Sequence, residues 1–289
     1  MPLTKQEWLA LEEKASELRH LCLDTTYWAG SGHIGGGMSI MDMLTVLYHK
    51  YLNIRVEEPL WEDRDRLIVS KGHAGIALAP VLVDKGFNDP EQLKTFNHTN
   101  SKMGIHLDAN KVVGVDASTG SLGHGLSIAV GTALAATLQK KDYITYCILG
   151  DGECNEGSNW EAAMTAAHFN VTNLISFVDR NKCMIDGPTE DVMGLEPFVD
   201  KWKAFGFIVK EIDGHNIKEL CETIDFALEN KEAPVMIVAN TIKGAGIDFM
   251  EDDYRWHYGA IDEEKYKKAK ASLDKYCKSR KERAEKEGA

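Results

Sequence analysis

Apolar positions along the chain fall into two patterns that alternate from one end to the other. Short runs rich in β-branched residues predict buried strands at 66–70, 143–149, 173–178, 207–209 and 234–239. Apolar residues at helical spacing or in alanine-rich runs predict helices at 8–28, 39–47, 126–138, 156–169, 199–205 and 217–228. This alternation predicts a single α/β domain over 1–289, with a doubly wound, mostly parallel sheet and helices on both faces.

Two segments stand outside this alternation. Residues 29–37 hold five glycines around His33, a composition typical of either a flexible turn or a loop that approaches a ligand closely. Ser39 follows as the expected N-cap of the helix over 39–47. A Lys- and Glu-rich helix is expected at about 261–289, and its charges are expected to form a solvated face with pairs four residues apart.

The stretch 143–186 carries the most specific chemistry. It comprises a strand, a Gly-Asp-Gly turn at 150–152, a helix, a second strand and a polar loop. In a parallel sheet both loops lie at the carboxyl ends of the strands, where open α/β sheets bind ligands. Asp151 and Asn181 offer hard oxygen donors of the kind that Mg²⁺ takes beside phosphate oxygens. Gly152 lets a backbone N–H approach an anion closely, so the residues predict a metal-bridged diphosphate. A lone Gly-Asp-Gly, by contrast, is commonly an ordinary tight turn.

Composition and charge narrow the class of protein. The formal net charge of −12 is spread over the chain, which disfavours a nucleic-acid surface because such a surface needs a basic stripe. The six cysteines show no zinc spacing and are expected to be free thiols in a reducing compartment. The N-terminus lacks a signal-peptide pattern, and no apolar run is long enough to cross a bilayer. A cytoplasmic protein without a nucleic-acid or membrane partner is expected.

The turn at 150–152, followed by Asn181 and by Ile-Asp-Gly at 185–187, resembles the thiamine diphosphate motif of transketolases and their relatives. The resemblance extends over nearly the whole chain. It implies that Asp151, Asn181 and the main-chain carbonyl of Cys183 bind Mg²⁺ or Ca²⁺. It also implies that Asn181 and Gly152 contact the diphosphate of the cofactor.

Three further motifs of that family supply expected histidines. The Ser-Gly-His-x-Gly loop implies that His33 meets the substrate beside the thiazolium ring, although many relatives carry Pro at the position of Ile34. The Ser-x-Gly-His motif implies that His73 bonds the diphosphate. The Gly-Ile-His motif implies that His106 reaches the donor sugar, although relatives commonly follow this histidine with Pro rather than Leu107.

Two more motifs complete the expected site. The Thr-Gly-x-Leu-Gly turn implies that Gly120, Ser121 and Leu122 line the ring side of the cofactor. The later glycine-rich loop and the Trp-His pair imply that Lys243 and His257 contact the cofactor, with His257 also catalytic. His124 stands where relatives often carry Gln, and either a hydrogen-bonding role or a proton-carrying role stays open for it.

The resemblance implies the N-terminal, diphosphate-binding subunit of a split transketolase. Such an enzyme transfers a two-carbon ketol unit from a ketose phosphate to an aldose phosphate. Imidazoles that titrate near neutrality suit its proton transfers, the metal neutralises the diphosphate, and the cofactor serves as electron sink. A separate C-terminal subunit, carrying the pyrimidine-binding domain and its glutamate, is expected to complete an α2β2 assembly.

Two alternatives stay open. The nearer one is a component of another thiamine diphosphate enzyme, such as a relative of 1-deoxyxylulose-5-phosphate synthase or a transketolase for an unusual ketose. The more distant one is a non-catalytic cofactor-binding module. Retention of the four histidines His33, His73, His106 and His257 disfavours the second alternative, because a protein that only binds the cofactor does not need the substrate-side histidines.

Overall fold

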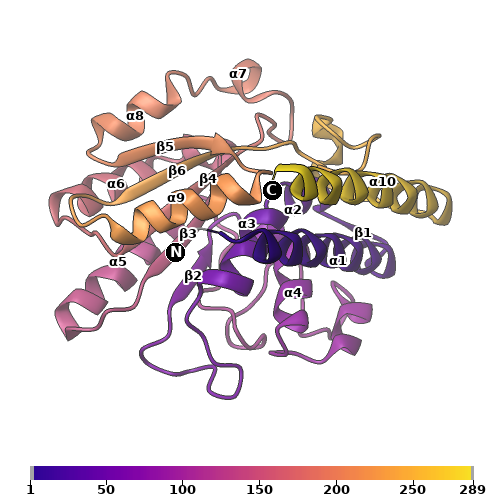
Figure 1. Ribbon diagram of the computed structural model, residues 1–289, viewed down its shortest axis with the longest axis horizontal. Coiled ribbons are helices and arrows are strands. Elements are labelled where there is room, and N and C mark those ends of the chain that lie inside the picture. Colours follow the sequence, from indigo (N-terminus) through magenta and orange to yellow (C-terminus); the bar gives the residue numbers. More distant parts are fainter. Residues whose placement is uncertain (1–2, 288–289) are drawn as a thin grey trace.

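A five-stranded parallel sheet forms the centre of the computed structural model, which describes residues 3–287 (Figure 1). The strands stand in the order β2 (Arg66–Val69), β3 (Thr145–Gly150), β4 (Leu174–Arg180), β6 (Val235–Asn240) and β5 (Ile208–Asp213). Each neighbouring pair is parallel, so the predicted α/β fold is confirmed. Residues 1–2 and 288–289, which the predicted domain includes, lie outside the described part of the chain.

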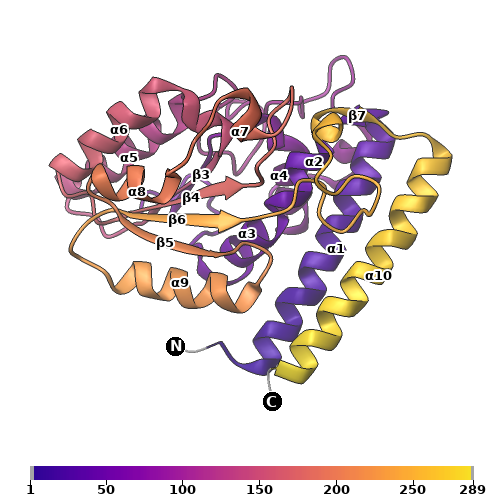
Figure 2. The same cartoon turned by 90° about the horizontal axis from the view of Figure 1, so that it is seen from above.

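Side chains of the central strands alternate between two apolar cores, one on each face of the sheet. In β3, Tyr146 and Ile148 belong to one core, and Cys147 and Leu149 belong to the other. The first core is covered by α1 (Lys5–Ala29), α2 (Ile34–Ser39), α3 (Met41–Val46), α4 (Gly75–Asp84) and α9 (Ile217–Glu229). The second core is covered by α5 (His124–Gln139), α6 (Gly157–His168) and α8 (Phe198–Ala204) (Figure 2). Strands buried on both faces explain the continuous apolar runs in the sequence.

Short elements and one long helix complete the fold. The long helix is α10 (Glu263–Glu287), which runs beside α1 in both ribbon views. The short elements are the antiparallel pair β1 (Ser31–Gly32) and β7 (Gly259–Ala260), the helix α7 (Thr189–Val192), a π-helical turn at Leu47–Tyr51, and 3₁₀ turns at Gly72–Ala74, Pro90–Thr95, Gly152–Asn155 and Tyr254–His257. Within residues 3–287 no helix combines the length and the apolar composition of a membrane span.

The glycine-rich segment differs from the expected loop, because its first part forms β1 and its second part forms α2. Ser39 therefore ends a helix, and Ile40 occupies the N-cap position of α3. The Ser39 hydroxyl donates to Asp179 Oδ2 at 2.7 Å and also contacts the Gly36 carbonyl at 3.1 Å. The predicted N-cap is wrong because this hydroxyl is bonded to a buried carboxylate of β4, a partner that local sequence does not reveal.

The C-terminal helix is only partly as expected. A predicted pair four residues apart is present, with Lys267 Nζ at 2.6 Å from Glu263 Oε1. Arg280, however, is buried against α1, where its Nε donates to Glu12 Oε2 at 2.7 Å. The expectation that the charges of α10 form a solvated face is therefore wrong for Arg280.

The carboxyl ends of four parallel strands bring distant polar segments to one edge of the sheet. Lys71 and His73 follow β2, Asp151 follows β3, Asn181 follows β4 and Lys243 follows β6. This is the edge at which open α/β sheets bind ligands. The topology thus gathers residues that lie up to 172 positions apart in sequence (71 to 243).

Candidate functional site

A cavity of about 350 Å³ opens at this edge of the sheet. All but one of the residues predicted for the site line it, namely His33, His73, His106, Gly120, Leu122, Asp151, Gly152, Asn181, Cys183, Lys243 and His257. Ser121 is exposed and is not among the lining residues. His124 lies at the first turn of α5 and also stays outside the lining. The structure therefore brings the predicted side chains into one pocket.

Three histidines form one wall of this pocket. The ring centroids of His33 and His73 lie 5.1 Å apart, and each lies within 5.3 Å of the His257 ring. Pairing of β1 with β7 sets Gly32 opposite Gly259, which carries His33 toward His257 across more than 200 residues of sequence. His33 Nδ1 is buried and has no hydrogen-bond partner among the described residues.

The same three imidazoles are held in the neutral form at neutral pH. Burial, followed by the positive charges of nearby groups, lowers the pKa of His33 to about 4 and that of His257 to about 3. The pKa of His73 is lowered for the same reasons, with Lys71 as the first neighbouring charge. The expectation that these three imidazoles titrate near neutrality is therefore wrong. The cause is burial beside two ammonium groups, Lys71 and Lys243.

Several oxygen atoms that could bind a metal ion belong to residues lining the same pocket. The buried Asp151 carboxylate accepts from the backbone N–H of Gly152 at 2.7 Å and from that of Lys182 at 2.6 Å. Asn181 Oδ1 accepts from the Cys183 N–H at 3.1 Å, and the Cys183 carbonyl accepts from Lys243 Nζ at 3.1 Å. Burial raises the pKa of the Cys183 thiol, so the thiol stays protonated at neutral pH. The atom of Cys183 that could bind a metal ion is therefore its main-chain carbonyl oxygen.

The oxygen atoms of Asp151, Asn181 and the Cys183 carbonyl are chemically suited to bind a hard cation rather than a soft one. They comprise one carboxylate, one amide oxygen and one main-chain carbonyl, which are ligands that Mg²⁺ and Ca²⁺ prefer. Among residues 3–287 no group of three or more His, Cys, Asp or Glu side chains is arranged to hold a metal ion. Lys243 Nζ donates a hydrogen bond to the Cys183 carbonyl at 3.1 Å, so this oxygen faces a position that is occupied by a positive charge.

Glycines leave room for a ligand and for the walls of the pocket. A Cβ at Gly120, whose φ is +147°, would lie 2.8 Å from His106 Cδ2. A Cβ at Gly152 would lie 3.0 Å from Met184 Cγ. Neither position accepts a larger residue without displacing a neighbour, which explains the glycines of both predicted motifs.

A buried network behind the pocket was missed by the sequence analysis. Asp179 of β4 is fully buried and accepts from Lys71 Nζ at 2.6 Å and from Asn181 Nδ2 at 2.8 Å. It also accepts from the hydroxyls of Ser39 and Thr241. Asp179 therefore fixes the amide of Asn181, so that Oδ1 is the atom left for a metal. The only local signal is an acidic residue at the end of an apolar run, and its four partners come from four different segments.

Glu153 is a second residue that the sequence analysis missed. Its buried carboxylate accepts from the backbone N–H of Gly123 at 2.9 Å and from that of Gly150 at 2.9 Å. The Ser70 hydroxyl is a third donor. Glu153 thereby ties together the turns after β2 and β3 and the start of α5, and both Gly150 and Glu153 line the pocket.

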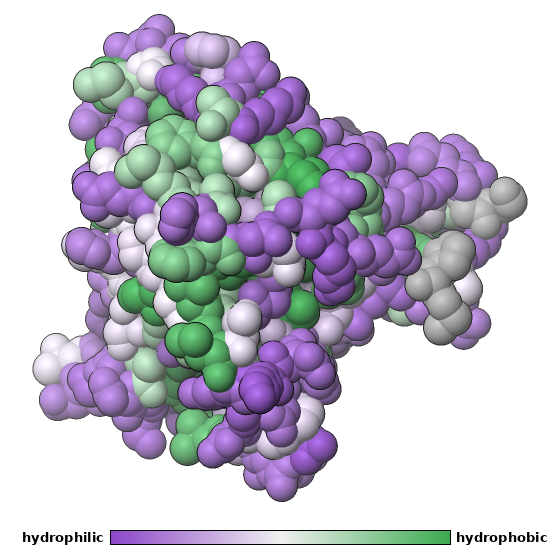
Figure 3. All heavy atoms as spheres, turned by 90° about the vertical axis from the view of Figure 1, so that its left-hand side faces the viewer, coloured by the Kyte–Doolittle hydropathy of each residue, from purple (hydrophilic) through white to green (hydrophobic). Residues whose placement is uncertain are grey.

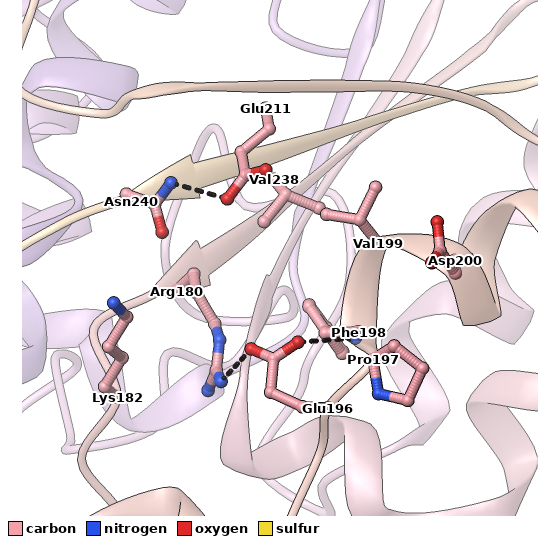
Figure 4. A pocket seen from close by; sticks show the side chains of 10 residues that line it. All are labelled: Arg180, Lys182, Glu196, Pro197, Phe198, Val199, Asp200, Glu211, Val238 and Asn240. Carbon is pink, nitrogen blue, oxygen red and sulfur yellow. Dashed lines mark hydrogen bonds and ion pairs between the residues drawn. The ribbon is translucent and has the colours of Figure 1, made fainter.

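Arg180 forms an ion pair with the Asp151 carboxylate. Its side chain points into a second cavity of about 200 Å³, where it pairs with Glu196 at 2.9 Å (Figure 4). Arg180 Nη1 also lies 3.2 Å from Asp151 Oδ2, and Nη2 lies 2.9 Å from Glu190. Strand β4 continues through Arg180, so this residue is not part of the polar loop in which the sequence analysis placed it.

Comparisons with known proteins point to one family. The family model described as "Transketolase, thiamine diphosphate binding domain" matches residues 11–279. The chain belongs to the transketolase family. The matched range contains all the residues that line the cavity described above.

Similar proteins include short subunits as well as long transketolases. The chain is 42% identical over 270 residues to the 6-deoxy-6-sulfo-D-fructose transketolase subunit SqwG of a Clostridium strain, covering 93% of this chain and 98% of that protein. It is 38% identical to one of the subunits of the apulose-4-phosphate transketolase of Phocaeicola vulgatus, covering 90% of this chain and 92% of that protein. A crystal structure of transketolase from Campylobacter jejuni superposes with a TM-score of 0.85 at 31% identity. That match covers 95% of this chain, and this chain spans only 45% of that transketolase.

Proposed function

We propose that the chain is the N-terminal subunit of a split transketolase, which transfers a two-carbon ketol unit from a ketose phosphate to an aldose phosphate. The observation that carries the proposal is the convergence of His33, His73, His257 and the Asp151–Asn181 donor set on one cavity. The family model and the two subunit relatives support the same activity. The proposal treats residues 1–289 as a single diphosphate-binding domain.

Thiamine diphosphate with Mg²⁺ or Ca²⁺ is the proposed cofactor. Asp151, Asn181 and the Cys183 carbonyl would hold the metal, and His73, Lys243 and the backbone of Gly152 would hold the diphosphate. The bound cofactor supplies an electron sink for cleaving and forming C–C bonds. The chain supplies position and charge, since the Lys243 ammonium lies 3.1 Å from the Cys183 carbonyl, on the side of the pocket where the diphosphate would lie.

The substrate-side roles fall to His33, His106 and His257. A neutral imidazole can accept a proton from a substrate hydroxyl or donate one from its other nitrogen. Among residues 3–287, His33 Nδ1 is buried and has no hydrogen-bond partner. Gly120 lets His106 approach the same cavity closely.

A separate C-terminal subunit is the proposed partner. Helices α5 and α6 pack against each other and begin at the rim of the pocket, next to Leu122 and Glu156. Their outer surface exposes Ile128, Leu138, Met164 and Phe169, the last by 60%. Figure 3 shows apolar side chains gathered in a band on this side of the molecule. An exposed apolar band that continues from a half-open site is typical of an interaction surface.

The proposed occupant of this surface is the subunit that carries the pyrimidine-binding domain. The two relatives that match over almost their full length are named as subunits, whereas the long transketolase holds more than twice this length in one chain. An α2β2 assembly of sugar-phosphate metabolism is the proposed form. A cytoplasmic location is proposed as well, and the six free cysteines favour a reducing compartment.

An unusual ketose is the second candidate for the donor. The named substrates of the two subunit relatives, a 6-deoxy-6-sulfo sugar and apulose 4-phosphate, favour it over an ordinary pentose phosphate. The test is to purify the chain with its partner and to assay ketol transfer with thiamine diphosphate and Mg²⁺. The donor panel should contain xylulose 5-phosphate, fructose 6-phosphate, 6-deoxy-6-sulfo-D-fructose and apulose 4-phosphate. Transfer from none of these ketoses would contradict the proposed function.

A further inference from the structure

His215 lies outside the pocket, in the connection between β5 and α9, yet it bonds a loop that enters the pocket. Its Nε2 accepts from the backbone N–H of Ile242 at 2.9 Å, and its Nδ1 lies 2.8 Å from Asp42 Oδ2. A backbone N–H can only donate, so Nε2 carries no proton. The proton of the neutral ring is therefore on Nδ1 and is donated to Asp42.

The Asp42 carboxylate is fully buried and anchors more than this ring. Arg19 of α1 donates to both of its oxygens, at 2.7 and 3.1 Å, and Arg280 of α10 donates to Oδ2 at 2.9 Å. Arg280 also pairs with Glu12 at 2.7 Å. The buried carboxylates of Glu12 and Asp42 thus face the buried guanidinium groups of Arg19 and Arg280. The four charges cancel, and a neutral His215 adds none.

Ile242 directly precedes the pocket lysine. Lys243 Nζ lies 3.1 Å from the Cys183 carbonyl and 3.2 Å from His257 Nδ1. On the other side of Lys243, the Gly244 N–H donates to the Gly35 carbonyl at 2.9 Å. The backbone on both sides of Lys243 is therefore fixed, on one side by His215 and on the other by α2.

The His215 side chain does not cap α9, although it lies just before that helix. Asn216 is the N-cap of that helix, and its side chain accepts from the N–H groups of Lys218 and Glu219. Asp213 Oδ1 accepts the backbone N–H of His215 itself at 2.8 Å. The imidazole is left with two bonds, one to Asp42 and one to the loop before Lys243.

We infer that His215 is a positioning residue for Lys243. Held by Asp42, its Nε2 fixes the Ile242 backbone so that the Lys243 ammonium faces the diphosphate side of the pocket. Through Asp42 and Arg280, the C-terminal helix α10 supports the same loop. The inference rests on the proposed function in one respect, which is the role of Lys243 toward the cofactor.

A matched pair of variants tests the inference. In His215→Asn the side-chain amide can still donate to Asp42 but is too short to reach Ile242, whereas the longer side chain of His215→Gln can place an oxygen where Nε2 lies. Losing one neutral hydrogen bond changes an opening equilibrium by about fivefold to tenfold. Amide hydrogen exchange of the full chain is the first measurement. We expect exchange at Ile242 and Lys243 to rise about fivefold to tenfold in His215→Asn and to stay near wild type in His215→Gln.

A double-mutant cycle separates positioning from general stability. The affinity of the chain with its partner for thiamine diphosphate in MgCl₂ is measured by calorimetry, in wild-type and Lys243→Met backgrounds. His215→Asn should weaken binding about tenfold in the first background and by less than about twofold in the second, because its effect passes through Lys243. An equal loss in both backgrounds, or unchanged exchange at Ile242, overturns the inference.

The inference can still be tested if the variant does not fold or if the proposed function is wrong. If His215→Asn does not fold, ¹⁵N NMR of the histidine rings in the wild-type chain still decides, since a protonated Nε2 on His215 contradicts the geometry. If the wild-type assembly does not bind thiamine diphosphate, the proposed function fails. The exchange measurement then still shows whether His215 holds the loop.

Discussion

Replacing Lys71 by Met is the perturbation that tests the buried network most severely. Lys71 Nζ and Asp179 Oδ2 lie 2.6 Å apart, and their side chains are only 2% and 0% exposed. Removing the ammonium leaves a carboxylate that cannot reach water. The loss of one partner from a buried ion pair costs about 3–5 kcal/mol in the free energy of unfolding.

The lower end of that range is expected here. Asp179 keeps three other donors, the hydroxyls of Ser39 and Thr241 and the amide of Asn181. We therefore expect a loss of about 3 kcal/mol. For a chain of 289 residues, whose unfolding entropy is about 2.1 cal/mol/K per residue, that corresponds to a fall in Tm of roughly 5 °C.

Thermal unfolding followed by circular dichroism, at pH 7 and without ligand, is the assay. The matched control is Lys71→Met combined with Asp179→Asn, which removes both charges and keeps the shape of the carboxyl group. The hydroxyls of Ser39 and Thr241 can rotate to accept from the new amide, so the double variant should recover at least about half of the loss. A single variant as stable as wild type, or a double variant less stable than the single one, would refute the reasoning.

Three further predictions concern the metal site, the substrate side and the apolar band. Asp151→Ala should abolish metal-dependent binding of thiamine diphosphate, measured by calorimetry. The chain should stay folded, because Arg180 keeps Glu190 and Glu196 as partners. Unchanged affinity would contradict the assignment of Asp151 as a metal ligand. His33→Ala should lower kcat/KM at least about tenfold with a much smaller change in cofactor affinity, as expected for an acid–base or polar group. Equal losses in kcat/KM and in cofactor affinity would instead indicate that His33 holds the cofactor. Met164→Asp should prevent assembly with the partner in light scattering, whereas the exposed Glu161→Gln on the same helix should not.

The pH dependence of stability follows from the buried histidines. The folded chain lowers the pKa of His33 to about 4 and that of His257 to about 3, from 6.5. Between these values the unfolded chain binds more protons than the folded chain, so acidification favours unfolding. Through these two histidines, Tm should therefore fall as the pH drops from about 6.5 toward 4. His33→Gln should reduce this slope, and a slope identical to that of wild type contradicts the assigned cause.

The sequence predicts the central unit of the fold well because its signals are local. The apolar runs of β3 and β4 and the Gly-Asp-Gly turn between them need no partner to be recognised. Ser39 was assigned wrongly because its hydroxyl bonds a carboxylate 140 positions away. Neutral histidines could not be foreseen either, since their pKa depends on burial beside Lys71 and Lys243. Arg280 looks like one of many exposed charges until α10 lies against α1.

The central claim is that the chain forms half of an active site. Its most direct test is to purify this chain alone and with the candidate C-terminal subunit, and to measure both mass by light scattering and ketol transfer with thiamine diphosphate and Mg²⁺. The account predicts no transfer by the chain alone and transfer by a complex that holds two copies of each subunit. Full activity of this chain without the partner would contradict it.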